Sequence, residues 1–501
     1  MTEQTLEYDI VIIGSGAGGG TVAKELAPLC KSGCRIALLE WGGRFQAKDN
    51  TRQELPMAER YYFDAGGFQT RSQDMTLAFA RAVGGSTTVY TGTSLKAPSD
   101  VFEAWAVPGI NALDLAPRYE KYIAENNVHL LGDTEINENN RLFVGACRTL
   151  GWRAEQFPVN VKGCQGLGTC NLGCAVLAKQ GTAVVQIPAA ERQGVEVIPW
   201  CRVHRLLDHE ILAEVIPPQY GLEPSPLRPG YYRIRSPRIV VSAGAVNSPA
   251  LLLRSFGDGQ SPALGRYFTC HPALILAAEH PKPIENTFGH PKSYYCDEFR
   301  KTQRFLLETC IYFPFTLAKS LTGFGPEPDD FLSHFDRLQM ILVLALDSAV
   351  PENRVSIDGN GNPVVRYRFS KELILSLTHA IRASMKIFFA AGAARAHAPA
   401  APDFFLHQAD RDRIDELVRP ERFKPGQVSI SAAHLMGGCR MGVDPRTSVT
   451  DSWGRVHGKK GLYVADASLF PDSVEINPYL TIMAIADRVA EGIRSELGAP
   501  I

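Results

Sequence analysis

The first group of residues suited to chemistry is a glycine-rich turn near the N-terminus, residues 14–19, with the spacing G-x-G-x-x-G. Gly14 permits a tight turn, and Gly19 lets a helix pack closely on a strand. Between them, Gly16 lets the backbone approach a pyrophosphate, and Ala17 is a predicted cofactor contact beside it. Roughly 20 residues later, Glu40 offers a carboxylate for ribose hydroxyls. The pattern predicts a dinucleotide site. A plain glycine-rich turn is the ordinary alternative, and NAD, NADP and FAD all remain open.

A second group consists of three cysteines, Cys164, Cys170 and Cys174, spaced C-x₅-C-x₃-C in a glycine-rich loop. Thiolates at such short spacing can bind an iron–sulfur cluster, which would direct electrons to a protein acceptor. The alternative is three thiols packed in a loop beside a cofactor. Zinc is disfavoured because a fourth ligand is not evident nearby.

Several strands must position the glycine turn. Residues 10–13 (Ile-Val-Ile-Ile) form an apolar run typical of a buried strand, and a second strand, residues 35–40, ends at Glu40. Residues 239–241 lead into another small-residue turn at Ala243, followed by a helical pattern. A late strand ends at Asp466, where ligands bind in an open α/β sheet. Because these strands are far apart in the sequence, the dinucleotide domain is expected to be discontinuous.

Apolar spacing predicts further elements outside that domain. The run from Met340 to Leu346 favours a core strand, and the Ala/Pro-rich run 394–402 a loop or linker. Helices are expected at residues 115–126, 139–150, 371–391 and 480–497.

The overall composition sets limits on function. A chain of 501 residues exceeds the size of a single core, so at least two domains are expected. A formal net charge of -1 argues against broad binding to nucleic acid. We find no run of ~18 apolar residues that predicts a transmembrane segment. Eleven cysteines are too few for a disulfide framework. A cytoplasmic location is expected, with peripheral contact to a membrane left open.

The chain resembles the glucose–methanol–choline (GMC) oxidoreductases, flavoproteins that oxidise alcohols with FAD. The resemblance covers nearly the whole chain, and its carriers are the 14–19 turn with Glu40, Gly84-Gly85-Ser86, Gly244-Ala245-x-Asn247-Ser248-Pro249, and the segment from His434 to Asn477. Within the family it is most similar to long-chain alcohol oxidases, through Lys179-Gln-Gly-Thr182, Leu342–Asp347, Ala390–Ala393, residues 433–442 and Asn477-Pro-x-x-Thr-Ile482.

This resemblance implies an α/β fold (α+β overall). A Rossmann-like FAD-binding domain would be interleaved with a substrate domain built on an antiparallel sheet with helices. The FAD-binding domain is expected to comprise residues 1–100, 160–275 and 430–501. The substrate or cap domain would then comprise residues 101–159 and 276–429.

The resemblance also assigns contacts to the cofactor. Glu40 would hold the adenosine ribose, and the backbone of Val203 would face the adenine. The flavin would lie under the Gly84-Gly85-Ser86 loop, with Tyr90 close by. Further expected contacts come from Ala243, Asp466 and Ala467, and from Pro478 beside the pyrimidine ring. Some relatives tether FAD through a histidine near the position of Val89, where valine cannot form the bond, so non-covalent FAD is expected.

Alcohol oxidation requires a group that accepts the hydroxyl proton while the carbinol hydride moves to the flavin. By resemblance that group is His434, and Asn477 would orient the substrate oxygen. A histidine in a satisfied core position is the ordinary alternative for His434. For His271 a structural role is favoured. Glu475 is interpreted as a solvent-facing or salt-bridged carboxylate rather than a second acid/base.

Three functions follow. The first is FAD-dependent oxidation of a long-chain or otherwise apolar primary alcohol to an aldehyde or ketone, with oxygen or a redox protein as electron acceptor. The second is a sugar or polyol dehydrogenase with an iron–sulfur cluster. The third is a flavin-binding protein without catalytic activity, against which the presence of both His434 and Asn477 argues.

Overall fold

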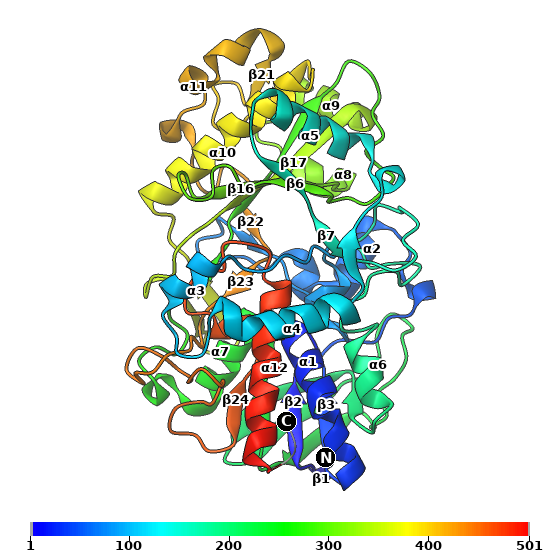
Figure 1. Cartoon of the computed structure of the whole chain (residues 1–501), viewed down its shortest axis with the longest axis vertical. Coiled ribbons are helices and arrows are strands. Elements are labelled where there is room, and N and C mark those ends of the chain that lie inside the picture. The colour runs from blue at the N-terminus through cyan, green and yellow to red at the C-terminus, as the bar shows by residue number, and fades with distance from the viewer. Residues whose placement is uncertain (1–3, 499–501) are drawn as a thin grey trace.

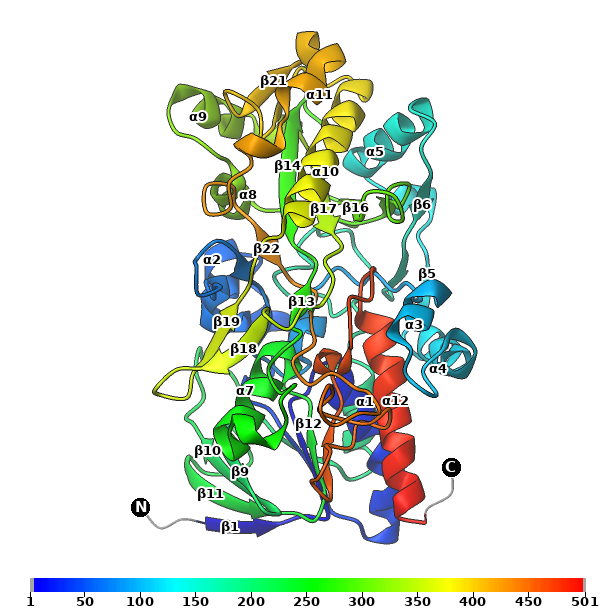
Figure 2. The ribbon, with the colours of Figure 1, turned by 90° about the vertical axis from the view of Figure 1, so that its left-hand side faces the viewer.

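The computed structural model describes residues 4–498 and contains two large sheets, one in each half of an elongated molecule (Figures 1 and 2). The lower sheet has five parallel strands whose order does not follow the sequence. In spatial order they are β24 (Leu462–Val464), β12 (Ile239–Val241), β2 (Ile10–Ile13), β3 (Ile36–Leu39) and β8 (Glu196–Ile198). Nearly all of their residues are buried, as expected for a sheet covered on both faces.

Helices and a small sheet cover this parallel sheet. On one side, α1 (Ala17–Leu26) packs along α12 (Tyr479–Glu496), and α6 (Gln186–Glu191) and α4 (Ala112–Glu125) pack against this pair. The other side carries α7 (Gly244–Phe256) and a four-stranded sheet, as Figure 2 shows. The strands of that sheet, in order, are β1 (Gln4–Glu7), β11 (Gly230–Arg235), β10 (Glu210–Val215) and β9 (Cys201–Leu207).

The upper sheet has nine strands and is almost entirely antiparallel. Its main path is β21 (Phe405–His407), β20 (Arg395–His397), β14 (Ala273–Glu279), β17 (Leu338–Ala345), β16 (Phe305–Thr309), β15 (Tyr294–Cys296) and β6 (Ala154–Gln156). Two short strands, β22 (Ser431–Ala432) and β4 (Thr76–Leu77), extend it beside β14. These two strands connect the upper sheet to the lower half of the molecule.

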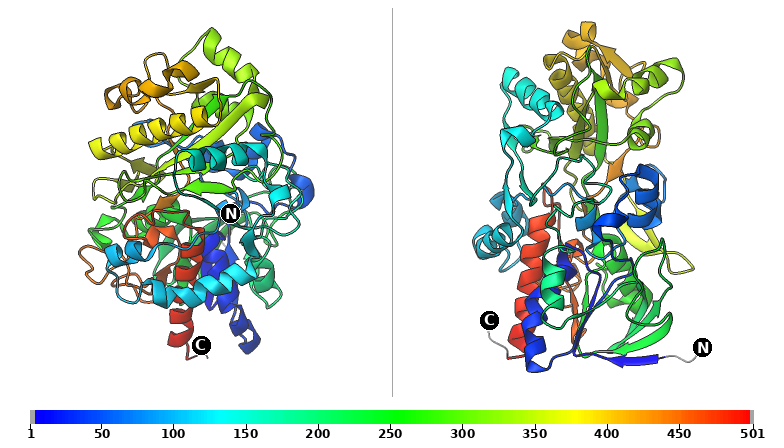
Figure 3. Two further views of the ribbon diagram at one scale, coloured as in Figure 1. Left: turned by 45° about the horizontal axis from the view of Figure 1, so that its top comes forward. Right: turned by 90° about the vertical axis from the view of Figure 1, so that its right-hand side faces the viewer.

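The two faces of the upper sheet differ in what covers them. Long helices α10 (Lys371–Ala390) and α5 (Glu138–Thr149) lie across one face, in yellow and teal in Figure 3. The opposite face packs against the short helices α8 (Pro314–Ser320) and α9 (Pro326–Ser333). By length and hydropathy, α10 is long and apolar enough to span a membrane. However, 67% of its apolar window is buried, as in an ordinary core helix.

Smaller elements complete the chain. They are α2 (Glu54–Tyr61), α3 (Ser99–Trp105), α11 (Ile414–Leu417), and the strand pairs β5 (Val128–Leu130) with β7 (Pro158–Asn160), β13 (Thr269–Cys270) with β23 (Leu435–Met436), and β18 (Arg354–Ile357) with β19 (Pro363–Arg366).

The predicted fold class is confirmed, and so are the four predicted helices, which correspond to α4, α5, α10 and α12. The loop prediction for residues 394–402 is wrong in part, because Arg395–His397 form β20 between β14 and β21. Alanine gives little local signal for a strand, so pairing with β14 decides the conformation. The domain limits stay a prediction.

Candidate active site

The glycine turn lies between β2 and α1, at the carboxyl end of the parallel sheet. Gly14 has a left-handed φ of +95°, and a Cβ there would lie 2.3 Å from the carbonyl oxygen of Ser242. A Cβ on Gly19 would lie 1.8 Å from the carbonyl oxygen of Gly14. Gly18, which sequence reasoning missed, is equally restricted, since its Cβ would lie 1.7 Å from the Ala465 carbonyl oxygen. Only glycine therefore fits these positions.

The second glycine loop, residues 84–86, meets the first at backbone distance. Gly84 and Gly85 both have positive φ, and a Cβ on Gly85 would lie 2.6 Å from the Cα of Gly16. The Gly84 amide donates to Ser15 Oγ at 2.9 Å. The Ser86 hydroxyl accepts from the Ala80 amide at 3.0 Å, which orders its own loop. The structure thus brings together the two loops predicted to contact the cofactor.

Glu40 is buried at the end of β3 and binds the glycine turn directly. Its carboxylate accepts from the Ser15 amide at 3.1 Å, from Ser15 Oγ at 2.6 Å and from the Gly42 amide at 2.8 Å. Burial raises the pKa of Glu40, and these donors oppose that shift. The contact of Glu40 with ribose stays a prediction. In the structure, the Glu40 carboxylate also holds Ser15 in position.

Asp466 joins the ends of two strands. Its carboxylate accepts from Ser248 Oγ at 2.5 Å and from the Gly244 and Ser468 amides, each at 2.8 Å. The Ala243 amide donates to Ser248 Oγ at 2.9 Å. Asp466 therefore holds the turn after β12 against the turn after β24, where Ala467 accepts from the Gly437 amide at 3.0 Å. Val203, on β9, is buried.

Three helices begin at this edge of the sheet without a side-chain cap. They are α1, α7 and α12, whose N-cap residues are Gly16, Ala243 and Pro478. Among the other helices, α4, α5 and α10 are capped by side chains of Asn111, Asn137 and Ser370, whereas α2, α3, α6, α8, α9 and α11 also begin without a side-chain cap. At α7 the Gly244 amide is already bound by Asp466, whereas the start of α1 leaves backbone N–H groups and partial positive charge available to an anion. The geometry suits a ligand with a pyrophosphate.

Two histidines form the centre of the site. The β13–β23 pairing sets Cys270 opposite Leu435, so His271 and His434 lie side by side. Their Nδ1 atoms are 3.0 Å apart, and His271 Nε2 lies 2.9 Å from Ser473 Oγ. His434 Nε2 lies 3.4 Å from Nδ2 of Asn477. His271 is fully buried, whereas His434 is half-buried.

The ring contacts fit two proton arrangements of opposite direction, and the one suited to a general base runs from His434 to Ser473. His434 donates its Nδ1–H to His271 Nδ1, and His271 donates its Nε2–H to Ser473 Oγ. His434 Nε2 is then left as an acceptor that faces Asn477. Burial lowers the pKa of His271 to about 3 and lowers that of His434 well below its usual value, so both are neutral at ordinary pH. A neutral imidazole can accept a proton, and the catalytic use of His434 stays a prediction.

Tyr90 and Asn477 are both close to α12. Asn160 donates to the Tyr90 hydroxyl, and the rings of Tyr90 and Tyr479 lie 5.0 Å apart. The Asn477 side chain is 3% exposed, and its Oδ1 has no hydrogen-bond partner within residues 4–498. That oxygen is an unused acceptor beside His434.

Sequence reasoning used Lys179 only as a family marker, but the structure places it in the site. Its Nζ donates to the carbonyl oxygens of Thr88, Tyr90 and Cys170 at 2.7, 2.7 and 2.6 Å. Burial lowers the pKa of Lys179 to about 8. This side chain joins the segment next to the Gly84–Ser86 loop to the cysteine loop.

The three cysteines are not arranged as a metal site. Within residues 4–498, no group of three or more His, Cys, Asp or Glu side chains could hold a metal ion. Cys164 and Cys174 accept from the Gly166 and Ala178 amides at 3.5 and 3.2 Å, and burial raises the pKa of Cys170 to about 12. The assignment of these cysteines as iron–sulfur ligands is therefore not supported by the described residues, and packed thiols stay the alternative.

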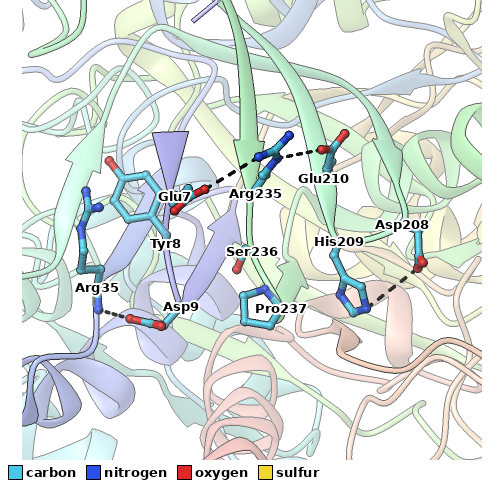
Figure 4. A pocket seen from close by; sticks show the side chains of 10 residues that line it. All are labelled: Glu7, Tyr8, Asp9, Arg35, Asp208, His209, Glu210, Arg235, Ser236 and Pro237. Atoms are coloured by element: carbon cyan, nitrogen blue, oxygen red, sulfur yellow. Dashed lines mark hydrogen bonds and ion pairs between the residues drawn. The ribbon is translucent and has the colours of Figure 1, made fainter. Parts of the chain in front are cut away.

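Two other features lie outside the site. Glu475 is in ion pairs with Arg300, at 2.6 Å, and with Arg304, so it has the salt-bridged role that was favoured. A pocket of about 520 Å³ lies at the opposite, amino end of β2, where charged side chains such as Arg235 and Glu210 pair with each other (Figure 4).

Comparisons with known proteins agree with this geometry. The GMC oxidoreductase family model matches residues 8–273 in its N-terminal part and 349–486 in its C-terminal part. A GMC-type oxidoreductase of Mycobacterium tuberculosis is 31% identical over 493 residues, which covers 96% of this chain and 75% of the relative. The chain belongs to the GMC oxidoreductase family. The family resemblance inferred from the sequence is thus confirmed.

Other GMC relatives have named substrates. A long-chain-alcohol oxidase of Arabidopsis thaliana is 26% identical, over 96% of this chain and 68% of the relative. Paromamine 6'-oxidase of Streptomyces fradiae is 25% identical, over 98% and 92%. Among solved structures, pyridoxine 4-oxidase from Mesorbium loti has a TM-score of 0.71 at 18% identity, covering 97% of this chain and 99% of that one. This last likeness shows the fold alone.

As a GMC oxidoreductase, the protein is an FAD-dependent enzyme that acts on alcohol CH–OH groups. Its residues fit that cofactor. The uncapped start of α1 offers donors to the pyrophosphate, Gly16 and Gly85 leave no side chain between their loops, and the Oδ1 of Asn477 lacks a partner among the described residues.

Proposed function

We propose that this GMC enzyme oxidises an alcohol to an aldehyde or ketone with His434 as proton acceptor and non-covalent FAD as hydride acceptor. The observation that carries the proposal is the chain His434–His271–Ser473, in which protonation of His434 on Nδ1 would leave its Nε2 as an acceptor next to Asn477. FAD, when bound, supplies the oxidising power. The side chains supply orientation and the transfer of the proton.

The proton transfer follows from the hydrogen bonds. A substrate hydroxyl at His434 Nε2 would lie within reach of the Asn477 amide, which orients its oxygen. As His434 takes the hydroxyl proton, its Nδ1–H stays bonded to His271 Nδ1, which holds the imidazole in place. The alkoxide character that develops makes the carbinol a better hydride donor. General-base assistance of this kind typically contributes ~10²–10⁴ in rate.

For the substrate, we propose a primary alcohol with a substantial apolar part. Apolar side chains lie on the face of the upper sheet opposite α10. They are Ile275, on the strand β14 that follows His271, and Leu342 and Leu344, on the neighbouring strand β17. The long-chain-alcohol oxidase relatives support such a substrate. A sugar dehydrogenase with an iron–sulfur cluster is less well supported, since the cysteines are not arranged to bind one.

For the electron acceptor, we propose oxygen, with a redox protein as the alternative. A cytoplasmic location stays a prediction.

Anaerobic reduction tests the proposal. The purified yellow holoenzyme is mixed, without oxygen, with fatty, aromatic and sugar alcohols, and loss of the flavin colour is followed. We expect bleaching by at least one alcohol and return of the colour in air. Bleaching that persists in air would assign a redox protein as acceptor. If none of the alcohols bleaches the flavin, the proposed function is wrong and a non-catalytic flavoprotein is favoured.

A further inference from the structure

A buried ion pair lies on the sheet face that looks away from α10. Glu308, on β16, is opposite Leu342, and Leu342 is opposite Ile275 on β14. Side chains in one such row point to the same face of a sheet. The neighbouring row, Leu274, Val343 and Leu307, packs with α10 on the other face. Glu308 therefore shares its face with the apolar wall that follows His271.

The partner of Glu308 is Lys292, whose Nζ donates to Oε2. Glu308 is 0% exposed and Lys292 is 6% exposed. Burial first, and then the neighbouring His271 and the charge of Lys292, lower the pKa of His434, which couples the ion pair to the active-site imidazole. Burial, followed by the charges of Lys179 and Lys292, lowers the pKa of His290 to about 4. The ion pair and the catalytic centre thus belong to one buried polar region.

The hydrogen bonds of this pair are incomplete. Oε1 of Glu308 is buried and has no partner among the described residues, and Lys292 Nζ donates to this one carboxylate. Another buried carboxylate in the same protein has more hydrogen-bond and ion-pair partners. Glu25 accepts from both Lys24 and Tyr122 and is also paired with Lys121. A buried charge is normally satisfied in this way, because unmet groups destabilise the fold.

The hydrogen-bonding groups that the ion pair leaves unused determine which ligand it can bind. The pair offers one acceptor, Glu308 Oε1, and the remaining N–H groups of Lys292. Its net charge is zero, so a carboxylate or an ammonium ion would bring an uncompensated charge into the site. A hydroxyl group both donates and accepts a hydrogen bond and carries no charge. It is the group that complements this pair.

We propose that Lys292 and Glu308 bind a second hydroxyl group of the alcohol substrate, which makes the preferred substrate a neutral diol or polyol rather than a simple alkanol. The substrate would place its apolar part along the wall that contains Ile275 and Leu342, one hydroxyl at His434 and another at the ion pair. This inference rests on the proposed alcohol oxidation and narrows its substrate class.

The test compares the two substrate types on the wild-type holoenzyme. Values of kcat/KM are measured for a series of α,ω-diols and for the 1-alkanols of the same chain length. We expect at least one diol to exceed its matched alkanol by roughly 10-fold or more, because a site built to bind a hydroxyl discriminates strongly against an analogue without it. Equal values along the whole series would overturn the inference while leaving alcohol oxidation intact.

A double variant, Lys292→Met with Glu308→Leu, removes both charges at similar volume and avoids leaving one charge unpaired. The preference for diols should fall to about parity. The control is Glu279→Leu with Arg395→Met, an ion pair on the same sheet remote from His434, which should keep the preference.

A Lys292→Met, Glu308→Leu variant that still prefers diols would overturn the inference. If it does not retain flavin, the wild-type comparison decides alone. Failure of every alcohol to bleach the wild type would overturn both this inference and the proposed function.

Discussion

The Nδ1 atoms of His271 and His434 lie 3.0 Å apart, so the two imidazoles share one proton and each fixes the tautomer of the other. The bond to Ser473 Oγ uses the second nitrogen of His271. His271 is fully buried and does not reach a substrate, so it acts through His434. We propose that His271, for which a structural role was predicted from the sequence, positions His434 in the site.

Replacing the proposed base should reduce turnover without loss of cofactor. We expect His434→Ala to lower kcat by about 10²–10⁴ because general-base assistance is lost. The flavin content should stay near one per chain, since the cofactor contacts lie on other residues. The measurement is kcat together with the flavin absorbance of the purified variant. A variant with near wild-type kcat would rule out His434 as the proton acceptor.

Replacing His271 should have a smaller effect that a conservative variant reverses. In His271→Ala the Nδ1–H of His434 has no acceptor, so the imidazole populates the wrong tautomer, and we expect kcat to fall by about 10-fold or more. In His271→Asn the amide oxygen can replace Nδ1, and much of the rate should return. The readout is the pH profile of kcat for both variants. Equal losses in the two variants would contradict the positioning role.

The buried histidines should make the protein less stable in acid. The pKa of His271 is about 3 in the folded protein and ~6.5 when unfolded, so the unfolded state binds more protons between these values. Stability from this group is fully present above about pH 6.5 and is lost as pH falls. We expect His271 alone to account for about 2 kcal/mol between about pH 7 and pH 5. Denaturant midpoints of wild type and His271→Asn, measured at both pH values, check this, and identical pH dependence would contradict it.

Lys179 should be needed to hold the loops around the flavin. Lys179→Met removes three hydrogen bonds to the carbonyl oxygens of Thr88, Tyr90 and Cys170 and leaves those oxygens buried. We expect a lower thermal midpoint and partial loss of flavin on gel filtration. Lys162→Met, an exposed lysine in the neighbouring segment, is the control and should behave as wild type. Full flavin retention in Lys179→Met would argue against this role.

The flavin should be released by acid. Val89 has no nucleophilic atom at the position where some relatives carry a linking histidine, and it is buried in an apolar cluster. Acid precipitation of the holoenzyme should therefore leave the yellow colour in the supernatant. A yellow pellet after washing would show a covalent bond and contradict the prediction.

The parallel sheet could be predicted because its signals are local and agree with one another. The apolar run 10–13, the glycines that follow and the carboxylate of Glu40 all indicate the same strand, turn and strand. The relation of His271 to His434 could not be predicted, since 163 residues separate them and the pairing of β13 with β23 sets their register. The buried pairing of Lys292 with Glu308 could not be predicted either, because charged residues of these types usually lie on the surface.

The cysteine loop shows the limit of spacing as evidence. Cys164, Cys170 and Cys174 are close in sequence, yet the fold uses two of their sulfurs as acceptors for backbone amides. Short spacing makes a metal site sterically accessible, but loop conformation decides whether the sulfurs converge. For Lys179 the sequence contains no comparable signal, because the three carbonyl oxygens that bind it come from two separate loops.

The central claim is that this enzyme transfers a carbinol hydride from an alcohol to FAD. It is tested most directly by anaerobic rapid mixing of the holoenzyme with an alcohol that bleaches the flavin, and with the same alcohol deuterated at the carbinol carbon. We predict that deuteration slows bleaching several-fold in the wild type, since that C–H bond breaks in the step observed. Bleaching that requires no alcohol, or the absence of bleaching with every alcohol tried, would contradict the claim.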